Sequence, residues 1–176
     1  MTDKSAVFFC SASNRIDPKY NQAAREVVRA ACLAGYGIVS GGSFRGTMGA
    51  VADTAAACGV PNKGVLPRFM RGLEHNALTE LVWKDTMSAR KEEMRRGTCL
   101  AVALPGGIGT MDELFETVVL AKLGRWSGLI IAYNFEGFFE PLKALLRHFV
   151  EEGMMEEEEL ALIHFPETLE EFKALI

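Results

Sequence analysis

The chain contains the stretch Pro105-Gly106-Gly107-Ile108-Gly109-Thr110-Met111-Asp112-Glu113, which separates two segments of different character. An apolar run from Cys99 to Leu104 precedes it, and an amphipathic segment follows it. We therefore expect a strand that turns sharply into a helix. The glycines allow the tight bend and leave backbone N–H groups free at the positive end of the helix, where a phosphate can bind.

Short apolar runs alternate with helical patterns along the whole chain, which favours a parallel sheet with helices on both faces. We expect strands at Ala6–Cys10, Gly37–Ser40, Gly64–Pro67, Leu78–Trp83, Thr98–Leu104, Gly128–Tyr133 and Leu160–Phe165. We expect helices between Asp17 and Gly35, after Gly46, from Thr86 to Arg96, from Thr110 to Leu123, from Phe138 to Val150 and from Thr168, where Glu171 would complete a capping box. No linker divides the chain, so we expect a single α/β domain over residues 1–176.

The composition excludes several classes of protein. With 176 residues, of which 49% are hydrophobic and 24% charged, the chain is long enough for one well-buried domain. Its net charge of −4 gives no sign of a nucleic-acid partner. No segment is apolar for the roughly 18 residues that a membrane span needs, and the N-terminus lacks a signal-peptide core. We therefore expect a cytoplasmic protein without a membrane partner.

Two further groups of residues have ordinary structural interpretations. The cysteines lie in apolar or helical stretches without metal-binding spacing, so we expect buried, reduced thiols at Cys10, Cys32, Cys58 and Cys99. The acidic residues Glu156–Glu159 are typical of a solvated surface turn.

A second glycine turn repeats the order of the first. Residues 40–48, Ser-Gly-Gly-Ser-Phe-Arg-Gly-Thr-Met, also place paired glycines, Gly41 and Gly42, after a strand and Gly-Thr-Met at the start of a helix. Open α/β sheets bind ligands in the crevice at the carboxyl ends of their strands. We expect both turns to be ready to accept an anion, although they need not contact the same ligand.

Two basic residues lie where the periodicity of the third expected helix calls for apolar ones. Met87, Arg90, Lys91 and Met94 share one helical face, and the methionines suggest that this face points inward. A cation held there needs an anionic partner from the protein or from a ligand. In the alternative, both side chains extend over the edge of the helix to solvent.

Spacing alone leaves two interpretations of Glu113 open. Its carboxylate stands one turn from the glycine turn and could act on a bound ligand. Thr110 and Glu113 also have the spacing of a capping box, in which the carboxylate would return to the N-cap amide and take no part in catalysis. Asp112 and Glu116 could likewise be acids favoured by the helix dipole.

Other familiar arrangements are missing from the sequence. His75, His148 and His164 lack ligand spacing, which predicts no metal site. No G-x-S-x-G supports a hydrolase nucleophile, and the glycine turns match neither the dinucleotide-binding pattern nor the P-loop.

The combined motifs resemble the Lonely Guy (LOG) family, the cytokinin riboside 5′-monophosphate phosphoribohydrolases, whose members are often labelled possible lysine decarboxylases. Met-x-x-Arg-Lys at residues 87–91, followed by Pro-Gly-Gly-x-Gly-Thr-x-x-Glu at residues 105–113, carries the resemblance. The similarity extends from Phe9-Cys10-Ser11 through Met48-Gly49-Ala50-Val51-Ala52-Asp53 to Phe138. A motif of nine positions with Arg-Lys at the right distance is a specific signal.

The resemblance implies a Rossmann-like, three-layer α/β/α fold with a mostly parallel central sheet. It implies hydrolysis of the N-glycosidic bond of a purine nucleoside 5′-monophosphate, N6-modified or plain, to the free base and ribose 5-phosphate, with no metal or organic cofactor. Arg90 and Glu113 would be the catalytic pair. The substrate-binding residues would be Glu74, Lys91, Gly106, Gly107, Ile108, Gly109, Thr110, Met111, Asp112, Gly41, Gly42 and Ser13.

The chain departs from the family pattern at several positions. Ser43 follows Gly41-Gly42 in place of a third glycine, and Thr47 replaces the usual Leu. The common family sequence Cys-Gly-Ser-Ser is replaced by Cys10-Ser11-Ala12-Ser13, and Val119 replaces a residue that commonly bears a hydroxyl group. These differences leave the preferred base open, so AMP could be cleaved as well as, or in place of, an N6-prenylated nucleotide. The rival hypothesis is a non-catalytic carrier of a nucleotide or a molybdopterin-type cofactor, which would need the glycine turn but no carboxylate beside the ribose.

The fourth expected helix predicts an oligomer. It is apolar over more than one face, with Leu114, Phe115, Val118, Val119 and Leu123. Such a helix can pack on its own sheet and on a partner chain, and small members of the family are dimers. We therefore expect a homodimer.

Overall fold

The computed structural model describes residues 4–176, in which seven strands form one sheet of order β4-β3-β2-β1-β5-β6-β7. Every neighbouring pair is parallel. The strands are β1 (Lys4–Phe9), β2 (Tyr36–Ser40), β3 (Asn62–Pro67), β4 (Glu80–Lys84), β5 (Leu100–Ala103), β6 (Leu129–Ala132) and β7 (Ile163–His164). All the strands expected from the sequence are present, so the predicted α/β fold with a parallel sheet is confirmed.

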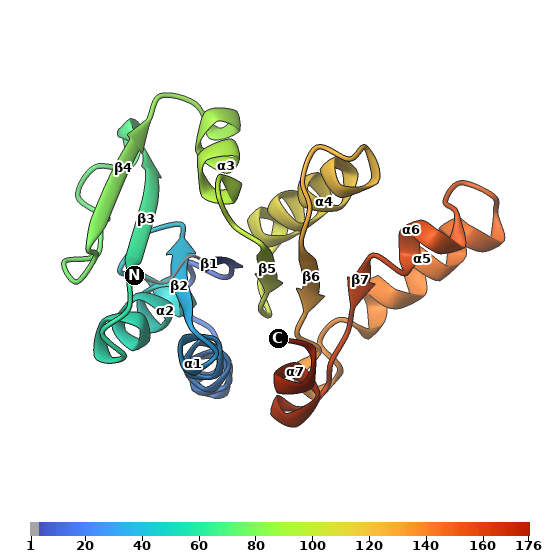
Figure 1. Cartoon of the computed structure of the whole chain (residues 1–176), viewed down its shortest axis with the longest axis horizontal. Helices are drawn as coiled ribbons and strands as arrows, with labels where there is room; N and C mark the ends of the chain where they lie inside the picture. Colours follow the sequence, from blue (N-terminus) through green and yellow to red (C-terminus); the bar gives the residue numbers. More distant parts are fainter. Residues whose placement is uncertain (1–3) are drawn as a thin grey trace.

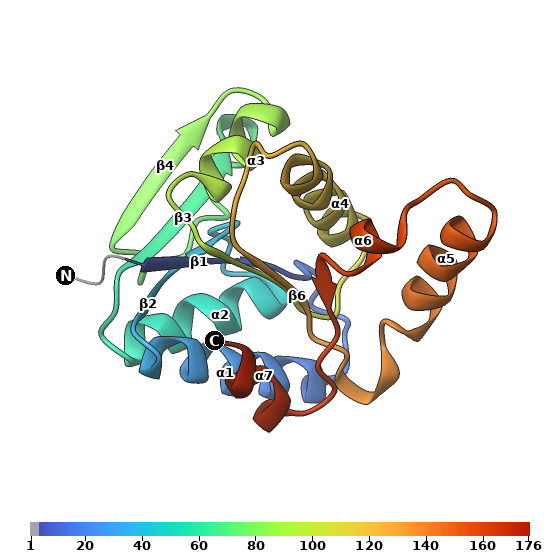
Figure 2. The same ribbon diagram turned by 45° about the vertical axis from the view of Figure 1, so that its right-hand side comes forward.

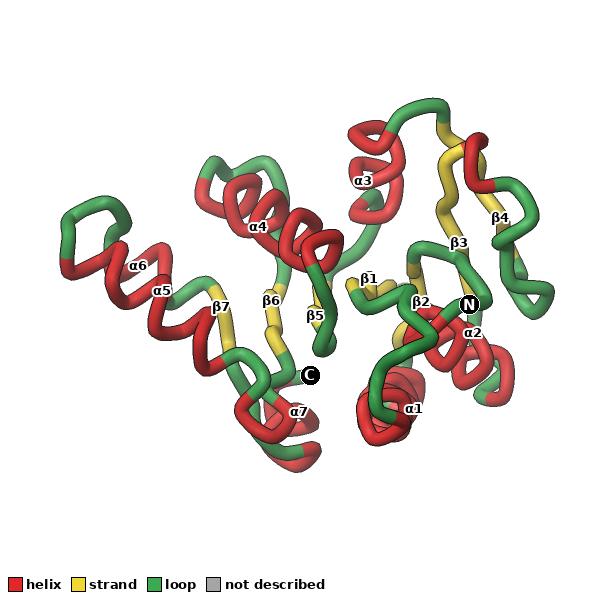
Figure 3. Tube along the Cα trace, turned by 180° about the vertical axis from the view of Figure 1, so that it is seen from behind, coloured by secondary structure: helices red, strands yellow, loops and turns green. Residues whose placement is uncertain are grey.

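Helices cover both faces of this sheet and make three layers (Figure 1). The helices are α1 (Pro18–Leu33), α2 (Gly46–Ala57), α3 (Met87–Arg95), α4 (Ile108–Lys122), α5 (Glu140–Glu151), α6 (Glu157–Leu160) and α7 (Leu169–Leu175), with short 3-10 turns at Arg68–Met70 and Phe135–Gly137. Figure 2 shows α1, α2 and α7 on one side of the sheet and α3 and α4 on the other. Seen from behind, α5 and α6 lie at the end of the molecule farthest from β4 (Figure 3).

The central strand β1 shows why the sheet lies between two layers of helices. Ala6 and Phe8 pack in the core shared with α1 and α2, whereas Val7 and Phe9 pack in the core that contains Met94 of α3. All four side chains are at most 1% exposed. A strand covered on both faces needs a continuous apolar run, which is what the sequence of β1 provides.

The order of the strands places a ligand crevice. The chain runs outward from β1 through β2 and β3 to β4, and then returns to the other side of β1 at β5. Ligands of open α/β sheets bind beside such a reversal, at the carboxyl ends of the strands. The loops that follow β1, β2 and β5 therefore meet at this place.

Helix starts agree with the sequence in some places and differ in others. Asp17 caps α1 by accepting a hydrogen bond from the Lys19 N–H at 2.9 Å, as predicted. Thr168 caps α7, but the Glu171 carboxylate accepts from the N–H of Glu167 at 2.7 Å rather than from that of Thr168, so the predicted capping box is wrong in this half.

The acidic segment expected as a turn is helical. Glu156 is the N-cap of α6, and the Glu159 carboxylate completes a capping box. Acidic side chains in a first turn are favoured by the helix dipole, and Glu157 also pairs with Arg147 of α5 at 2.7 Å. The segment is solvated as expected, because Glu156, Glu157 and Glu158 are exposed, but it forms a short helix rather than a turn.

The four cysteines are unpaired, but they are not all buried. Cys10 and Cys32 are buried, Cys58 is partly exposed and Cys99 is exposed. Cys99 lies just before β5, at the exposed end of the apolar run that forms this strand. Within residues 4–176, no helix has both the length and the apolar character needed to cross a membrane.

Candidate active site

A cavity of about 340 Å³ lies at the reversal of strand order. Its walls come from the loop after β1, the glycine turn after β2, the segment after β3, the first turns of α3 and the start of α4. Ligand pockets in proteins begin at about 300 Å³. The cavity is therefore of the size that suits one small molecule.

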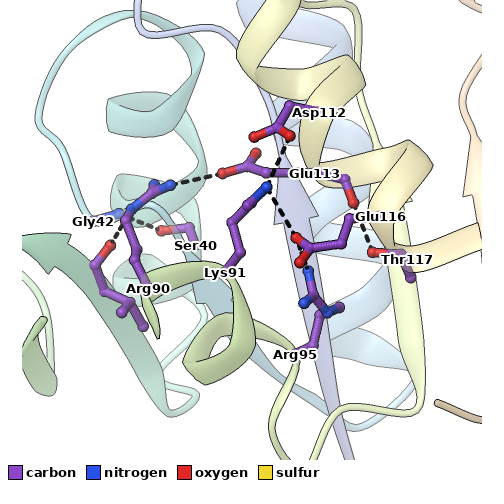
Figure 4. A network of polar contacts seen from close by, with 10 residues as sticks. Ser40, Gly42, Arg90, Lys91, Arg95, Asp112, Glu113, Glu116 and Thr117 are labelled. Atoms are coloured by element: carbon purple, nitrogen blue, oxygen red, sulfur yellow. Dashed lines mark hydrogen bonds and ion pairs between the residues drawn. The ribbon is translucent and has the colours of Figure 1, made fainter. Parts of the chain in front are cut away.

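A buried ion pair in the lining of this cavity joins α3 to α4, and Figure 4 shows the pair. Arg90, from α3, donates from Nη1 to Oε1 of Glu113, from α4, at 2.8 Å. The side chains are only 7% and 6% exposed. Arg90 Nε also donates to the backbone carbonyl of Val65 in β3 at 2.8 Å, which fixes the plane of the guanidinium. The inward position of Arg90 is confirmed, and the solvent-directed alternative is wrong for this residue.

Glu113 is not the capping acid of its own helix. The N-cap of α4 is Gly107, so α4 begins two residues before the expected Thr110. Glu113 consequently lies in the second turn, where its carboxylate faces Arg90 and its carbonyl accepts from the Thr117 hydroxyl at 2.7 Å. The capping-box interpretation is corrected by this earlier start.

The environment of Glu113 opposes its ionisation. Burial raises the pKa of Glu113 above its ordinary value, and the Arg90 guanidinium counteracts this without cancelling it. Cys10, also in the cavity wall, is fully buried, and burial together with Glu113 raises the pKa of its thiol well above the ordinary range. The thiol is therefore neutral, while the carboxyl group keeps a raised pKa despite its cationic partner.

A second polar network lies beside the first and ties α3 to α4 (Figure 4). Lys91 Nζ lies 2.8 Å from Asp112 Oδ1 and 3.1 Å from Glu116 Oε2. Arg95 reaches the same Glu116 oxygen at 2.9 Å. Although burial works against the charged forms, these pairs raise the pKa of Lys91 and lower that of Glu116. The network holds the two helices at a fixed distance and so fixes the Arg90–Glu113 pair.

The start of α4 offers free donors to the cavity. The helical hydrogen bonds of α4 begin with the one from the Met111 N–H to the carbonyl of the N-cap residue, Gly107. The N–H groups of Ile108, Gly109 and Thr110 come before this bond and have no carbonyl partner within the helix. The Thr110 hydroxyl oxygen is buried and has no hydrogen-bond partner among residues 4–176. A ligand anion at this helix end would satisfy these groups together.

The second glycine turn is not free in the same way. The N–H of Gly46 donates to the Asn14 side chain at 2.8 Å, and the N–H of Met48 donates to the Ser11 carbonyl at 3.2 Å. The second turn is therefore less ready to accept an anion than expected, because the loop after β1 already occupies two donors at the start of α2.

Two glycines permit close approaches at the site. A Cβ at Gly41 would overlap Arg90 Nη2, and a Cβ at Gly106 would overlap the Thr110 hydroxyl oxygen. Neither glycine has a positive φ, so it is the crowding, and not the backbone conformation, that leaves no room for a Cβ at these positions. Gly41 keeps room for the guanidinium, and Gly106 keeps room for the hydroxyl.

These contacts predict different kinetic defects for two otherwise similar variants. We expect Gly41→Ala to displace the guanidinium and lower kcat by about 10- to 100-fold. We expect Gly106→Ala to displace the Thr110 hydroxyl and mainly raise KM. Steady-state kinetics of both purified variants checks this, with thermal unfolding as the control for folding. Identical defects in the two variants would contradict the assignment.

The structure brings together only part of the predicted site. Predicted residues that line the cavity are Arg90, Glu113, Gly41, Gly107, Gly109, Thr110 and Asp112. Predicted residues outside the lining are Lys91, Gly42, Gly106, Ile108, Met111, Ser13 and Glu74. Glu74 accepts a hydrogen bond from the Gly72 N–H at 2.6 Å, and Ser13 Oγ accepts from the Arg15 N–H at 3.2 Å, so both side chains serve local turns.

The cavity also contains residues that the sequence did not single out as binding residues. One wall is apolar and consists of Met48, Leu66, Met70, Leu73 and Met87. Polar or small additions are Ser11, Ala12, Ser43 and Arg45. The apolar residues come from separate segments and share no periodicity. Arg45 carried one usable signal, because it is the only cation inside the glycine turn of residues 40–48.

Comparisons with known proteins give the family. The family model described as "Possible lysine decarboxylase" matches residues 48–176. A cytokinin riboside 5′-monophosphate phosphoribohydrolase of Mycobacterium tuberculosis is 35% identical over 86% of this chain and 81% of that protein. A protein of the same name from Rhodococcoides fascians is 32% identical over 88% of this chain and 79% of its own.

Solved structures confirm the fold. The molybdenum cofactor carrier protein of Chlamydomonas reinhardtii superposes with a TM-score of 0.74 at 18% identity, over 98% of this chain and 95% of that chain. The molybdenum cofactor binding protein of Rippkaea orientalis gives a TM-score of 0.70 at 17% identity, over 98% and 94%. At these identities the likeness concerns architecture alone. The family match and the sequence identities together show that this chain belongs to the LOG, or "possible lysine decarboxylase", family, with a Rossmann-like fold.

Proposed function

We propose that this chain hydrolyses the N-glycosidic bond of purine nucleoside 5′-monophosphates and releases the free base and ribose 5-phosphate. The observation that carries the proposal is the buried Arg90–Glu113 pair, which faces the same cavity as the start of α4. The names of the relatives with 35% and 32% identity support the same reaction.

The carboxylate suits the chemistry of this bond. Water supplies the oxygen that bonds to C1′ of the ribose, the C1′–N9 bond breaks, and one proton of the water ends on the departing base. The sugar becomes cation-like in the transition state, as in glycoside hydrolysis. An ionised Glu113 beside C1′ stabilises that charge and orients the water. Arg90 holds the carboxylate in place through its 2.8 Å hydrogen bond.

The phosphate and the base have separate places in the cavity. The N–H groups at the start of α4 and the unpartnered Thr110 hydroxyl would bind the phosphate. The apolar wall, which includes Leu66 and Met87, would take the planar base. Binding energy from the phosphate then positions the ribose against Glu113.

The decarboxylase label is a poor match to the same cavity. Pyridoxal phosphate chemistry needs a lysine that forms a Schiff base. No lysine of the described residues lines the cavity. Lys91, on the same helix as Arg90, is held by Asp112 and Glu116.

We expect the purified protein to release base and ribose 5-phosphate from a purine nucleoside 5′-monophosphate. Chromatography of incubations with AMP, IMP, GMP and isopentenyl-AMP measures the product directly. The matching nucleosides, which lack the phosphate, should react at least about 100-fold more slowly at equal concentration, because remote binding energy is lost. Tight binding of nucleotides without any base release would favour the carrier hypothesis.

We also propose that the protein is a homodimer that uses α4. Leu114 and Val118 of this helix are buried in the protein's own core, whereas Ile108, Val119 and Leu123 are 89%, 52% and 62% exposed. An apolar second face of this kind is typical of a subunit contact. Analytical ultracentrifugation at micromolar concentration should show a dimer, and Val119→Glu should shift it to monomer. A wild-type protein that sediments only as monomer would refute the proposal.

A further inference from the structure

Arg45 is a cavity residue whose charge is not used inside the protein. It is the N-cap of α2, it lines the cavity, and it is exposed. Within residues 4–176, no carboxylate forms an ion pair with its guanidinium. The other charged groups of the cavity are paired, Arg90 with Glu113 and Asp112 with Lys91. Arg45 is therefore free to bind a ligand.

The position of Arg45 indicates which part of the ligand it meets. The phosphate donors lie at the start of α4, which follows β5. Arg45 follows β2, and β1 lies between β2 and β5 in the sheet. The apolar residues Leu66 and Leu73 belong to β3 and the segment after it, on the same side of β1 as Arg45. With the phosphate at α4 and the ribose at Glu113, the base extends toward Arg45.

The turn that carries Arg45 is held firmly. The Ser43 hydroxyl accepts a hydrogen bond from the Arg45 N–H at 3.2 Å, and the Arg45 carbonyl accepts from the Gly49 N–H at 3.2 Å. Ser43 also pairs with Glu74 through an isolated β-bridge, which joins the turn to the segment after β3. The backbone is thus fixed, while the long side chain keeps its freedom to meet the base.

The chemistry of the guanidinium selects between purines. Arginine has only hydrogen-bond donors. A 6-oxopurine presents two adjacent acceptors, O6 and N7, which a guanidinium binds in a fork, whereas a 6-aminopurine presents one acceptor and one donor. Resting on the proposed function, we propose that Arg45 determines specificity by binding the O6/N7 edge of the base, so that the protein prefers 6-oxopurine nucleotides such as IMP to AMP.

IMP and AMP form a matched pair of probes, because they differ only in the group at position 6 of the base and in the proton on N1. We expect wild-type kcat/KM to be about tenfold higher for IMP than for AMP. Arg45→Met keeps a long, unbranched side chain but removes every hydrogen-bond donor of the guanidinium. It should lower kcat/KM for IMP about tenfold, leave that for AMP nearly unchanged, and bring the ratio close to one.

The control variant is Arg29→Met, which alters an exposed arginine of α1 that does not line the cavity. Its IMP/AMP ratio should equal that of the wild type. A wild-type ratio at or below one, or the same ratio in Arg45→Met as in the wild type, would overturn the role of Arg45.

A binding experiment separates this inference from the proposed reaction. If neither nucleotide releases its base, the proposed function fails, but calorimetric Kd values for IMP and AMP still test Arg45. The wild type should bind IMP about tenfold more tightly, and Arg45→Met should bind both alike. Equal wild-type affinities, or no measurable binding of either nucleotide, would overturn the inference.

Discussion

Glu113→Gln should lower kcat for nucleotide cleavage by about 10³-fold or more, while the Kd of the nucleotide changes little. Glutamine has the size of glutamate and keeps an oxygen that can accept the Arg90 hydrogen bond of 2.8 Å. It carries no negative charge, so it neither stabilises a cation-like ribose nor accepts a proton from water. Single-turnover kinetics and calorimetric binding of the same nucleotide measure the two effects separately.

A matched acid-to-amide change tests whether this loss depends on position. Glu92→Gln alters an exposed carboxylate of α3 whose ion pair is with Arg96, outside the cavity. We expect wild-type kinetics from it. If Glu113→Gln keeps more than about a tenth of the wild-type kcat, the carboxylate is not the group that supports the chemistry.

The sequence predicts the fold well because burial on two faces leaves a clear pattern. Runs such as Ala6–Cys10 must be apolar to lie between two layers of helices, and each expected run became a strand. The helix starts that were predicted wrongly depend on backbone groups and loop contacts, which hydrophobic periodicity does not describe. Gly107 caps α4 without a side-chain hydrogen bond, so no polar residue marked its start. The start of α2 has partners in the loop after β1, which only folding brings near.

The candidate site was predictable only where a charged residue occupied a position at which the helical periodicity calls for an apolar one. Arg90 occupied an apolar position, which called for an anionic partner from the protein or from a ligand, and Glu113 is that partner at 2.8 Å. The argument from the methionines was half right, because Met94 is fully buried whereas Met87 is 41% exposed. Arg45 gave no such conflict, since a charged residue in a glycine turn is expected at the surface. Its place in the cavity follows from the strand order.

Arg90→Met should destabilise the fold by about 3–5 kcal/mol near neutral pH, as well as abolish activity. The change removes the counter-charge of a side chain that is 6% exposed, so Glu113 is left as a buried carboxylate without a cation. Because Arg90 holds down the pKa of Glu113 against the effect of burial, its removal raises that pKa further. Urea denaturation at a series of pH values measures the loss.

The sign of the pH dependence follows from this raised pKa. The unfolded chain ionises Glu113 at the ordinary value and the folded chain only at a higher pH, so the folded state binds more protons between the two. The free energy of unfolding therefore falls as pH rises through that window, and the Arg90→Met penalty is full above the folded-state pKa. Acidification should recover stability in Arg90→Met relative to the wild type.

A second substitution distinguishes the charge from the lost packing of the arginine. In Arg90→Met/Glu113→Gln no ionisable group remains at the pair, so most of the 3–5 kcal/mol should return and the extra pH dependence should vanish. A double variant no more stable than Arg90→Met would show that the loss comes from the Val65 contact and the packing of α3 instead. Recovery of stability without recovery of activity would show that the fold needs only a balanced charge at this pair, whereas the reaction needs the ionisable groups themselves.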